Sequence, residues 1–332
     1  MVKSMYAAVA GLKSHQTKMD VISNNIANVN TWGFKSQTTS FKDSMYQNNT
    51  VGSAGAVGVG SAGGTNTSQI GFGVNVGAIS VNYTTGAWSP TGRSLDCMIN
   101  GSGFFLVGPM QDGSKTDNGT DTVAGIKGDS LASSNLKLSK VGIFAVDGNG
   151  YLVDDQGNYV YGYQGTWDDT NKSWKIDSSS ENARLVPIRI PSKSTKLENG
   201  NVSHPAEGTD ENSKRPIINT YKIGDDGKIV GTTETGDIVT IGQIAVASVE
   251  NVNGLEHDQG YYYTPGANVG KISGGATTIS TGKILSGYLE MSNVDLAKEM
   301  SDMITTQRGY QANTKIITVT DEMLSELVSM KR

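Results

Sequence analysis

Apolar and small side chains recur near the start of the chain at spacings that alternate between three and four residues. The positions are Met5, Ala8, Leu12, His15, Met19, Ile22, Ile26 and Val29. Such a spacing puts the side chains on one side of an α-helix and is typical of a heptad seam. Asparagines crowd the stretch from Asn24 to Asn30. Because asparagine and glycine tolerate the left-handed conformation that ends helices, we expect the helix to stop between Asn28 and Gly33.

A second heptad pattern runs along the C-terminal end of the chain. Its positions are Met300, Met303, Gln307, Tyr310, Thr314, Ile317, Asp321, Leu324 and Val328. They predict a helix over about 294–330, whose apolar stripe is interrupted once per heptad by Gln, Thr and Asp. Ser292 or Asn293 is the expected N-cap, with Asp295 in the first turn.

Between the helices the hydrophobic pattern becomes short and alternating, which is typical of β-strands joined by tight turns. Residues 143–162 predict a meander with turns at 147–150 and 155–158. Further strands are expected around residues 74–81, 98–107, 221–230 and 238–249. The expected fold is mainly β with α-helical termini. The N- and C-terminal helices pair as a coiled-coil inner domain, and the central β-rich region contains hairpins and meanders.

The same pattern divides the chain into four parts. These are residues 1–47 plus 288–332 as a helical terminal assembly domain, 48–68 as a Gly-rich connector, 69–163 plus 219–287 as a β-rich core domain, and 164–218 as a small inserted outer subdomain. Gly, Ala, Ser, Thr and Asn dominate the connector, so an extended chain is expected there. The insert has too few apolar residues for a large core of its own.

The two terminal helices need partners beyond each other. A pair of helices leaves part of each apolar stripe in water, and most helical stability comes from tertiary packing. Neighbouring subunits best cover that surface. Repeated contacts between copies of one chain give a ring if they close and a helical filament if they do not. The pattern predicts assembly without choosing between these two forms.

Charge and composition argue against several classes of function. The formal net charge is -5 and no cluster of Lys or Arg occurs, which disfavours binding to nucleic acid or anionic membranes. No run approaches the roughly 18 apolar residues of a membrane-spanning helix. The apolar run at the N-terminus is too short for a signal peptide, so we expect any export to proceed without a cleaved leader. A single cysteine, Cys97, cannot form an internal disulfide and is expected to be a buried thiol.

Motifs for catalysis, cofactors and metals are weak. Gly58–Gly63 satisfies G-x-G-x-x-G, but no helical pattern follows, so a connector is the better interpretation. Asp147 begins a stretch that lacks the sixth-position Gly and closing Glu of a calcium loop, which favours a hairpin turn. His15, His204 and His257 lie far apart and offer no metal-ligand spacing. We predict no enzyme activity, catalytic residue, cofactor, metal site or small-molecule substrate.

Four sequence motifs lie at the two ends of the chain. Residues 20–35 read DVISNNIANVNTWGFK, and residues 287–297 read GYLEMSNVDLA. Residues 307–313 and 321–328 read QRGYQAN and DEMLSELV. Together, and in this order, the motifs closely resemble the flagellar rod, hook and hook-associated family of axial proteins. Segments of the β-rich middle, such as residues 95–107, are also similar to that family.

The resemblance implies a fold and a role. In this family the terminal helices form an inner coaxial tube, the β-domain forms an outer shell, and the flagellar type III export apparatus exports subunits uncleaved. The implied partners are other copies of the chain and the neighbouring rod, hook-cap and hook–filament junction proteins. The implied location is the extracellular hook or basal body of the bacterial flagellum. The connector and the block from Leu289 to Leu296 favour a hook subunit, which assembles into a curved tube that acts as a universal joint between rod and filament in motility.

The expected assembly interface combines the helical seams with the family motifs. It comprises Met5, Leu12, Met19, Ile22, Asn24, Asn25, Ile26, Asn28, Gly33, Phe34, Met291, Asn293, Leu296, Met300, Met303, Gln307, Tyr310, Asn313, Ile317, Leu324 and Val328. The alternative within the family is a distal rod protein of the basal body. A more distant alternative is a surface adhesin or glycan-binding module that uses Trp167, Trp174 and Tyr261–Tyr263 as an aromatic platform.

Overall fold

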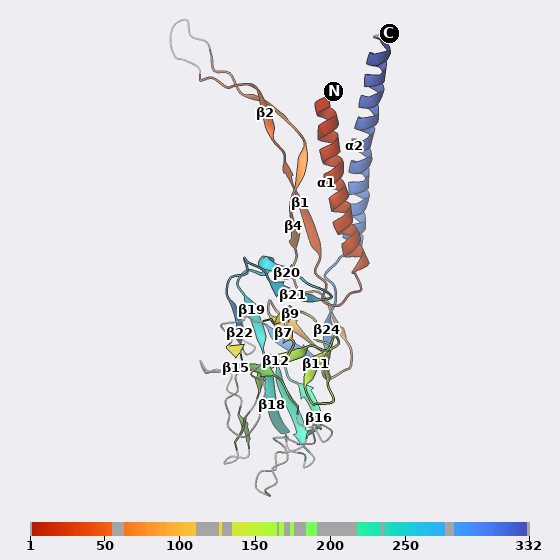
Figure 1. Ribbon diagram of the computed structural model, residues 1–332. Helices are drawn as coiled ribbons and strands as arrows, with labels where there is room; N and C mark the ends of the chain where they lie inside the picture. The colour runs from red at the N-terminus through yellow and green to blue at the C-terminus, as the bar shows by residue number, and fades with distance from the viewer. Residues whose placement is uncertain are drawn as a thin grey trace. The chain divides into compact units, whose positions relative to one another are not determined.

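The computed structural model describes residues 2–54, 63–110, 126–127, 135–164, 166–168, 173–175, 184–190, 218–233, 236, 238–275 and 282–330. Figure 1 shows the chain as a ribbon. Its contacts divide it into two compact units. We call Met1–Val29, Lys35–Asn82 and Val294–Arg332 the helical unit, and Asn30–Phe34 with Tyr83–Asn293 the β unit.

The helical unit contains both α-helices found among the described residues, α1 (Val2–Ala27) and α2 (Leu296–Met330). They lie side by side and run in opposite directions (Figure 1). The predicted helix at each end of the chain is thus confirmed, and the two helices contact each other. Their pairing as a heptad coiled coil stays a prediction.

The ends of the helices show how local chemistry sets their limits. At the end of α1 the Asn28 side-chain amide donates to the backbone oxygen of Asn24 at 2.9 Å. At the start of α2 the Asp295 Oδ1 accepts from the backbone N–H groups of Ala297 at 3.0 Å and Lys298 at 3.3 Å. The N-cap is therefore Asp295, and the expected cap at Ser292 or Asn293 was wrong. Asp295 caps the helix because its carboxylate reaches the unpaired N–H groups of the first turn.

Two antiparallel strand pairs complete the helical unit. Strand β1 (Gln37–Asp43) pairs with β4 (Val74–Val81), and β2 (Tyr46–Thr50) pairs with β3 (Ser68–Gly71). Figure 1 shows β2 and β3 continuing as a narrow two-stranded ribbon beyond β1 and β4. The predicted connector thus begins and ends in strands, and its Gly58–Gly63 motif lies largely outside the described residues.

The β unit is built around one large, mainly antiparallel sheet. Its longest path runs β16-β17-β18-β12-β7-β9-β21-β20. These strands are β16 (Ile218–Ile223), β17 (Lys228–Thr233), β18 (Ile238–Ile244), β12 (Tyr159–Gln164), β7 (Phe104–Gly108), β9 (Lys137–Ser139), β21 (Tyr262–Pro265) and β20 (Leu255–His257). Strands off this path are β8 (Ile126–Lys127), β10 (Phe144–Val146), β11 (Leu152–Asp154), β15 (Arg184–Pro187), β19 (Val246–Val249) and β22 (Ile272–Gly275).

Three small two-stranded sheets accompany the large one. They pair β5 (Trp88–Pro90) with β24 (Tyr288–Glu290), β6 (Cys97–Asn100) with β23 (Lys283–Ser286), and β13 (Thr166–Asp168) with β14 (Ser173–Lys175). A short 3-10 helix, Val252–Gly254, precedes β20. The predicted mainly β middle is confirmed. The meander is confirmed as well, because β10 pairs with β11 and β11 with β12.

Strand β7 contributes side chains to both buried clusters of the core. All five of its residues are buried. Phe105 and Val107 belong to one cluster of buried side chains, and Phe104 and Leu106 belong to another. Since successive side chains of a strand point to opposite faces, β7 lies in a sheet that is covered on both faces. This accounts for its uninterrupted apolar run.

Candidate functional site

Helix α1 is held within the chain by the β1–β4 pair. The Ser14 hydroxyl lies 3.1 Å from the backbone oxygen of Val74. The Asn25 amide donates to the backbone oxygen of Gln37 at 2.8 Å, and its Oδ1 accepts from the Gln37 N–H at 3.0 Å. Asn25 is fully buried. The strand pair therefore covers a side of α1 that carries small and polar residues.

The contact between α1 and α2 pairs glycines with larger side chains. A Cβ at Gly11 of α1 would lie 2.8 Å from the Asn313 amide nitrogen of α2. A Cβ at Gly309 of α2 would lie 2.8 Å from the His15 ring of α1. Each glycine thus makes room for the side chain opposite, and the two helices approach closely at this level.

The side of α2 that is buried in the single chain mixes polar and apolar residues. Its buried residues are Glu299, Thr306 and Thr320. Partly buried positions on the same side are Met303, Tyr310, Asn313, Ile317 and Leu324. Gln307, Thr314 and Asp321 are exposed, so the polar interruptions expected in the seam lie on the solvent side of α2 in the single chain. The buried side is turned by about one residue from the expected seam.

Many apolar side chains of α2 are exposed to solvent. Those that are exposed are Leu296, Met300, Ile304, Ile316, Val319, Met323, Leu327, Val328 and Met330. We call Ile316, Val319, Met323, Leu327 and Met330 the distal apolar stripe. Five members at spacings of three or four place this stripe on one side of the helix. Val328, next to it, is 70% exposed.

The predicted interface residues fall into groups. On α1, Ile22 is buried, while Met5, Leu12, Met19 and Ile26 are partly buried and Asn24 is exposed. After α1, Asn28 and Phe34 are partly buried and Gly33 is buried. Before α2, Met291 is exposed and Asn293 is partly buried. Their part in assembly stays a prediction.

The distal apolar stripe was missing from the predicted interface. The signal was present, because residues 316, 319, 323, 327 and 330 repeat at helical spacing. The expected seam used the neighbouring positions 317, 321, 324 and 328 instead. Two adjacent stripes of this kind differ by one residue, and spacing alone does not say which one a partner helix covers.

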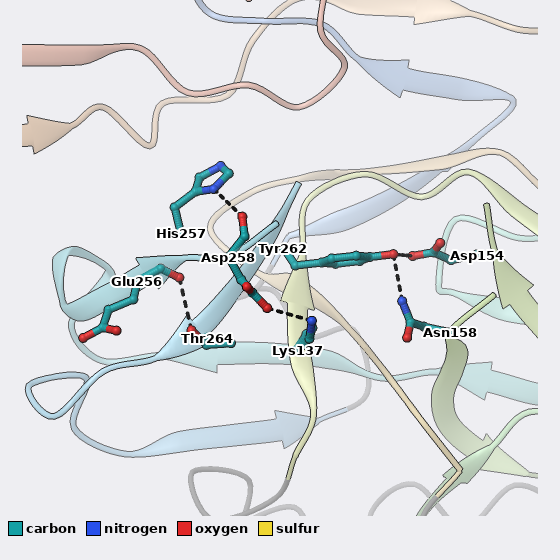
Figure 2. Close-up of polar contacts among 8 residues, drawn as sticks. All are labelled: Lys137, Asp154, Asn158, Glu256, His257, Asp258, Tyr262 and Thr264. Atoms are coloured by element: carbon teal, nitrogen blue, oxygen red, sulfur yellow. Dashed lines mark hydrogen bonds and ion pairs between the residues drawn. The ribbon is translucent and has the colours of Figure 1, made fainter. Parts of the chain in front are cut away.

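A polar cluster in the β unit joins β9, the β11–β12 turn and the β20–β21 hairpin (Figure 2). The Tyr262 hydroxyl donates to Asp154 Oδ2 at 2.6 Å and accepts from the Asn158 amide at 2.9 Å. Lys137 Nζ lies 2.7 Å from Asp258 Oδ2. These groups satisfy one another, which identifies the cluster as a structural tie between strands.

The pKa shifts in this cluster follow from burial and from its bonds. Burial, and then the bond to Asp154, raises the pKa of Tyr262. The Lys137 ammonium lowers the pKa of Asp258. Burial and then the neighbouring Asp154 raise the pKa of Asp155 to about 6.

The described residues contain no group of three or more His, Cys, Asp or Glu side chains placed to hold a metal ion. Asp147 lies in a hairpin turn, in which its backbone oxygen accepts from the N–H of Gly150 at 2.8 Å. Cys97 is fully buried, as expected, and burial raises the pKa of its thiol. Neither described helix combines the length and apolar character that a membrane crossing requires.

The adhesin alternative needs exposed aromatic side chains, and two of the tyrosines expected in its platform are buried. Tyr262 is 1% exposed and Tyr263 is 3% exposed, so two of its three tyrosines belong to the core. Consecutive strand residues alternate between faces, but here both faces of the sheet are covered. The side chains of Trp167 and Trp174 lie outside the described residues.

Two family models match the ends of the chain. Residues 5–35 match the flagella basal body rod protein, and residues 285–330 match the flagellar basal body rod FlgEFG protein C-terminal. Both matches include the helices that carry the geometry above.

Relatives extend the similarity to the whole chain. The flagellar basal-body rod protein FlgG of Bacillus subtilis is 35% identical over 334 residues, covering 100% of both chains. The flagellar hook protein FlgE of Borreliella burgdorferi is 29% identical over 447 residues, again covering 100% of both. The flagellar hook protein FlgE of Escherichia coli is 27% identical over 419 residues, covering 98% of this chain and 99% of that protein. The chain thus belongs to the family of flagellar rod and hook proteins.

Proposed function

We propose that this chain is a structural, non-catalytic subunit of the bacterial flagellar hook, which assembles with identical copies into a helical tube. The observation that carries the proposal is the exposure of apolar side chains along α2. A contiguous apolar surface of this kind marks an interaction site in a protein exposed to water. A different side of α2 already contacts α1, so the distal apolar stripe is left for neighbouring subunits.

A helical tube is favoured over a closed pair. In the proposed tube, the distal apolar stripe of one copy packs on a different surface of the next copy. Contacts between unlike surfaces repeat from copy to copy, and they give a filament when the rotation does not close.

The hook position is supported by resemblance. The Gly-rich connector and the block from Leu289 to Leu296 look like those of short hook proteins. Two of the relatives above are flagellar hook proteins, each covering 98% of this chain or more. In this role the tube would link rod to filament, and the partners would be rod, hook-cap and hook–filament junction proteins. Export would use the flagellar type III apparatus without a cleaved leader.

A distal rod subunit is the second candidate. The alignment with the B. subtilis rod protein is only 334 − 332 = 2 positions longer than this chain. The alignment with the B. burgdorferi hook protein is 447 − 332 = 115 positions longer. That hook protein therefore carries segments that this chain lacks, whereas the rod protein has almost none.

Deletion of the gene in its host, followed by electron microscopy of isolated basal bodies, separates the two candidates. Complete rods without hooks are the result expected for a hook subunit. Rods that stop short of their distal end would assign the chain to the distal rod. Unaltered flagella would contradict both positions.

A substitution on α2 tests the self-assembly step directly. Met323→Lys puts a charge into the distal apolar stripe, and the lost burial should raise the concentration needed for polymerisation about tenfold or more. Gln311→Lys, at an exposed polar position on the same helix, is the control and should polymerise like the wild type. Sedimentation of purified protein measures both. Equal polymerisation of the two variants would argue against α2 as the interface.

A further inference from the structure

The β2–β3 ribbon is exposed on both of its faces. All five residues of β2 and all four of β3 are exposed. Apolar side chains are among them or beside them: Tyr46 is 55% exposed, Ile70 is 51% exposed and Met45 is 77% exposed. A two-stranded ribbon alone in water is marginally stable at best. A covering surface or a further strand would therefore stabilise the ribbon.

Each strand of the ribbon has one paired edge and one open edge. Among the described residues, β2 and β3 pair only with each other. An open edge presents unpaired N–H and C=O groups, which makes it a template for another strand. Proteins normally protect such edges with charged side chains, Lys above all.

That protection is missing here. The sequence contains no Asp, Glu, Lys or Arg from Ser44 to Gly92, although charged residues make up 18% of the chain. The ribbon lies inside this uncharged segment. Because it carries no charge, two identical ribbons can approach without repulsion.

Side-chain hydrogen bonds within one copy hold the ribbon together and link it to α1. At its base, Lys3 Nζ of α1 donates to Gln47 Oε1 at 2.6 Å. Further along, the Gln69 amide donates to Asn48 Oδ1 at 2.7 Å across the strands. The Ser68 N–H donates to Thr50 Oγ1 at 3.2 Å. These bonds fix the register of β2 and β3 within one copy.

We propose that the β2–β3 ribbon of one copy adds edge to edge to the ribbon of a second copy, with the β2 edge of one on the β3 edge of the next. This inference rests on the proposed function, because polymerisation supplies a second copy at a fixed offset. Pairing unlike edges leaves an open edge at each end, so the contact propagates along a polymer. Pairing between two β2 edges alone, or between two β3 edges alone, would stop at two copies.

Mixed disulfide formation in the full-length protein tests the proposal. One preparation carries Asn48→Cys on β2 and another carries Gln69→Cys on β3, while the native Cys97 is buried. The two are mixed, polymerised and oxidised. Crosslinks between one Asn48→Cys chain and one Gln69→Cys chain are expected to dominate. Crosslinks between two chains of the same variant would show like-edge pairing and overturn the proposal, as would polymers without crosslinks.

A charge variant gives a second, independent readout. Asn48→Lys restores charge to the β2 edge and should raise the concentration needed for polymerisation about tenfold. Gln16→Lys, at an exposed position of α1, is the control. Unchanged polymerisation of Asn48→Lys would contradict edge pairing. A wild-type chain that fails to polymerise at all would instead overturn the proposed function.

Discussion

At the residue scale, close backbone approach matters more than side-chain type at several positions of the β unit. A Cβ at Gly142 would lie 2.2 Å from the backbone oxygen of Cys97 and 2.9 Å from the Phe105 ring. The Cys97 N–H donates to the Gly142 oxygen at 2.9 Å, so the two segments are hydrogen-bonded as well as tightly packed. Only glycine fits there without moving backbone.

Gly142→Ala should therefore destabilise the β unit by about 3 kcal/mol, because a backbone atom cannot yield as the end of a flexible side chain can. Gly148→Ala is the matched control, since a Cβ at Gly148 would meet no atom within 4 Å. Urea unfolding followed by tryptophan fluorescence compares the two. Equal midpoints would show that the 97–142 contact relaxes freely.

Asp155 is expected to make the free energy of unfolding depend on pH. Its folded-state pKa is raised from 3.8 to about 6, by burial first and then by Asp154. The neutral form is favoured by folding, so this stabilisation is full below pH 3.8 and is lost as the pH rises through about 6. The effect on stability is small because the residue is only partly withdrawn from water, which screens its charge.

Asp155→Asn removes this titration. Relative to the wild type, the variant should gain stability between pH 4 and pH 7.5, because it has no carboxyl proton to lose. Thermal unfolding of both proteins at the two pH values measures the difference. Wild-type and variant stabilities that change in parallel would contradict the assignment.

At the element scale, the start of α2 depends on a single cap. Asp295 accepts from two backbone N–H groups of the first turn, those of Ala297 and Lys298. The three residues after the cap, Leu296, Ala297 and Lys298, are all exposed, and Glu299 is the first buried residue of the helix. The cap thus contributes a large part of the local stability.

Asp295→Ala should cost about 1 kcal/mol of helix stability, and Asp295→Asn should cost much less because its side-chain oxygen still caps. Circular dichroism at 222 nm during thermal unfolding reports the loss. If Asn and Ala had the same effect, the carboxylate charge at the helix N-terminus would matter more than the hydrogen bonds.

At the scale of the whole molecule, the two units differ in how well they are buried. The β unit holds both clusters of buried apolar side chains. In the helical unit, many apolar side chains of α2 and the ribbon stay exposed. The helical unit should therefore be the less stable of the two before assembly, because stability follows buried apolar surface.

Calorimetry of the unassembled chain should accordingly show two transitions. Asp295→Ala should lower the first, which belongs to the helical unit, and Gly142→Ala should lower the second. Polymerisation should raise the first transition most, because assembly covers the exposed stripe of α2. A single transition that moves with both substitutions would show that the units unfold together.

The sequence by itself determined the elements and the family. Heptad spacing placed a helix at each end, and alternation with turns at 147–150 and 155–158 placed the meander. These signals are local, because a helix or turn depends on residues only a few positions apart. The family motifs could be recognised for the same reason, because each is a short run of sequence near one end of the chain.

Only the tertiary structure decided which surfaces those elements use. It turned the buried side of α2 to Thr306, Asn313 and Thr320 and left the distal apolar stripe exposed. In the structure Asn25 is buried and bonded to Gln37 of the same chain. The sequence had suggested Asn25 for an interface between copies. Neighbouring helical stripes differ by a single residue, so spacing cannot choose between them. The choice depends on what packs across from each stripe, and those contacts come from parts of the chain that are far apart in sequence.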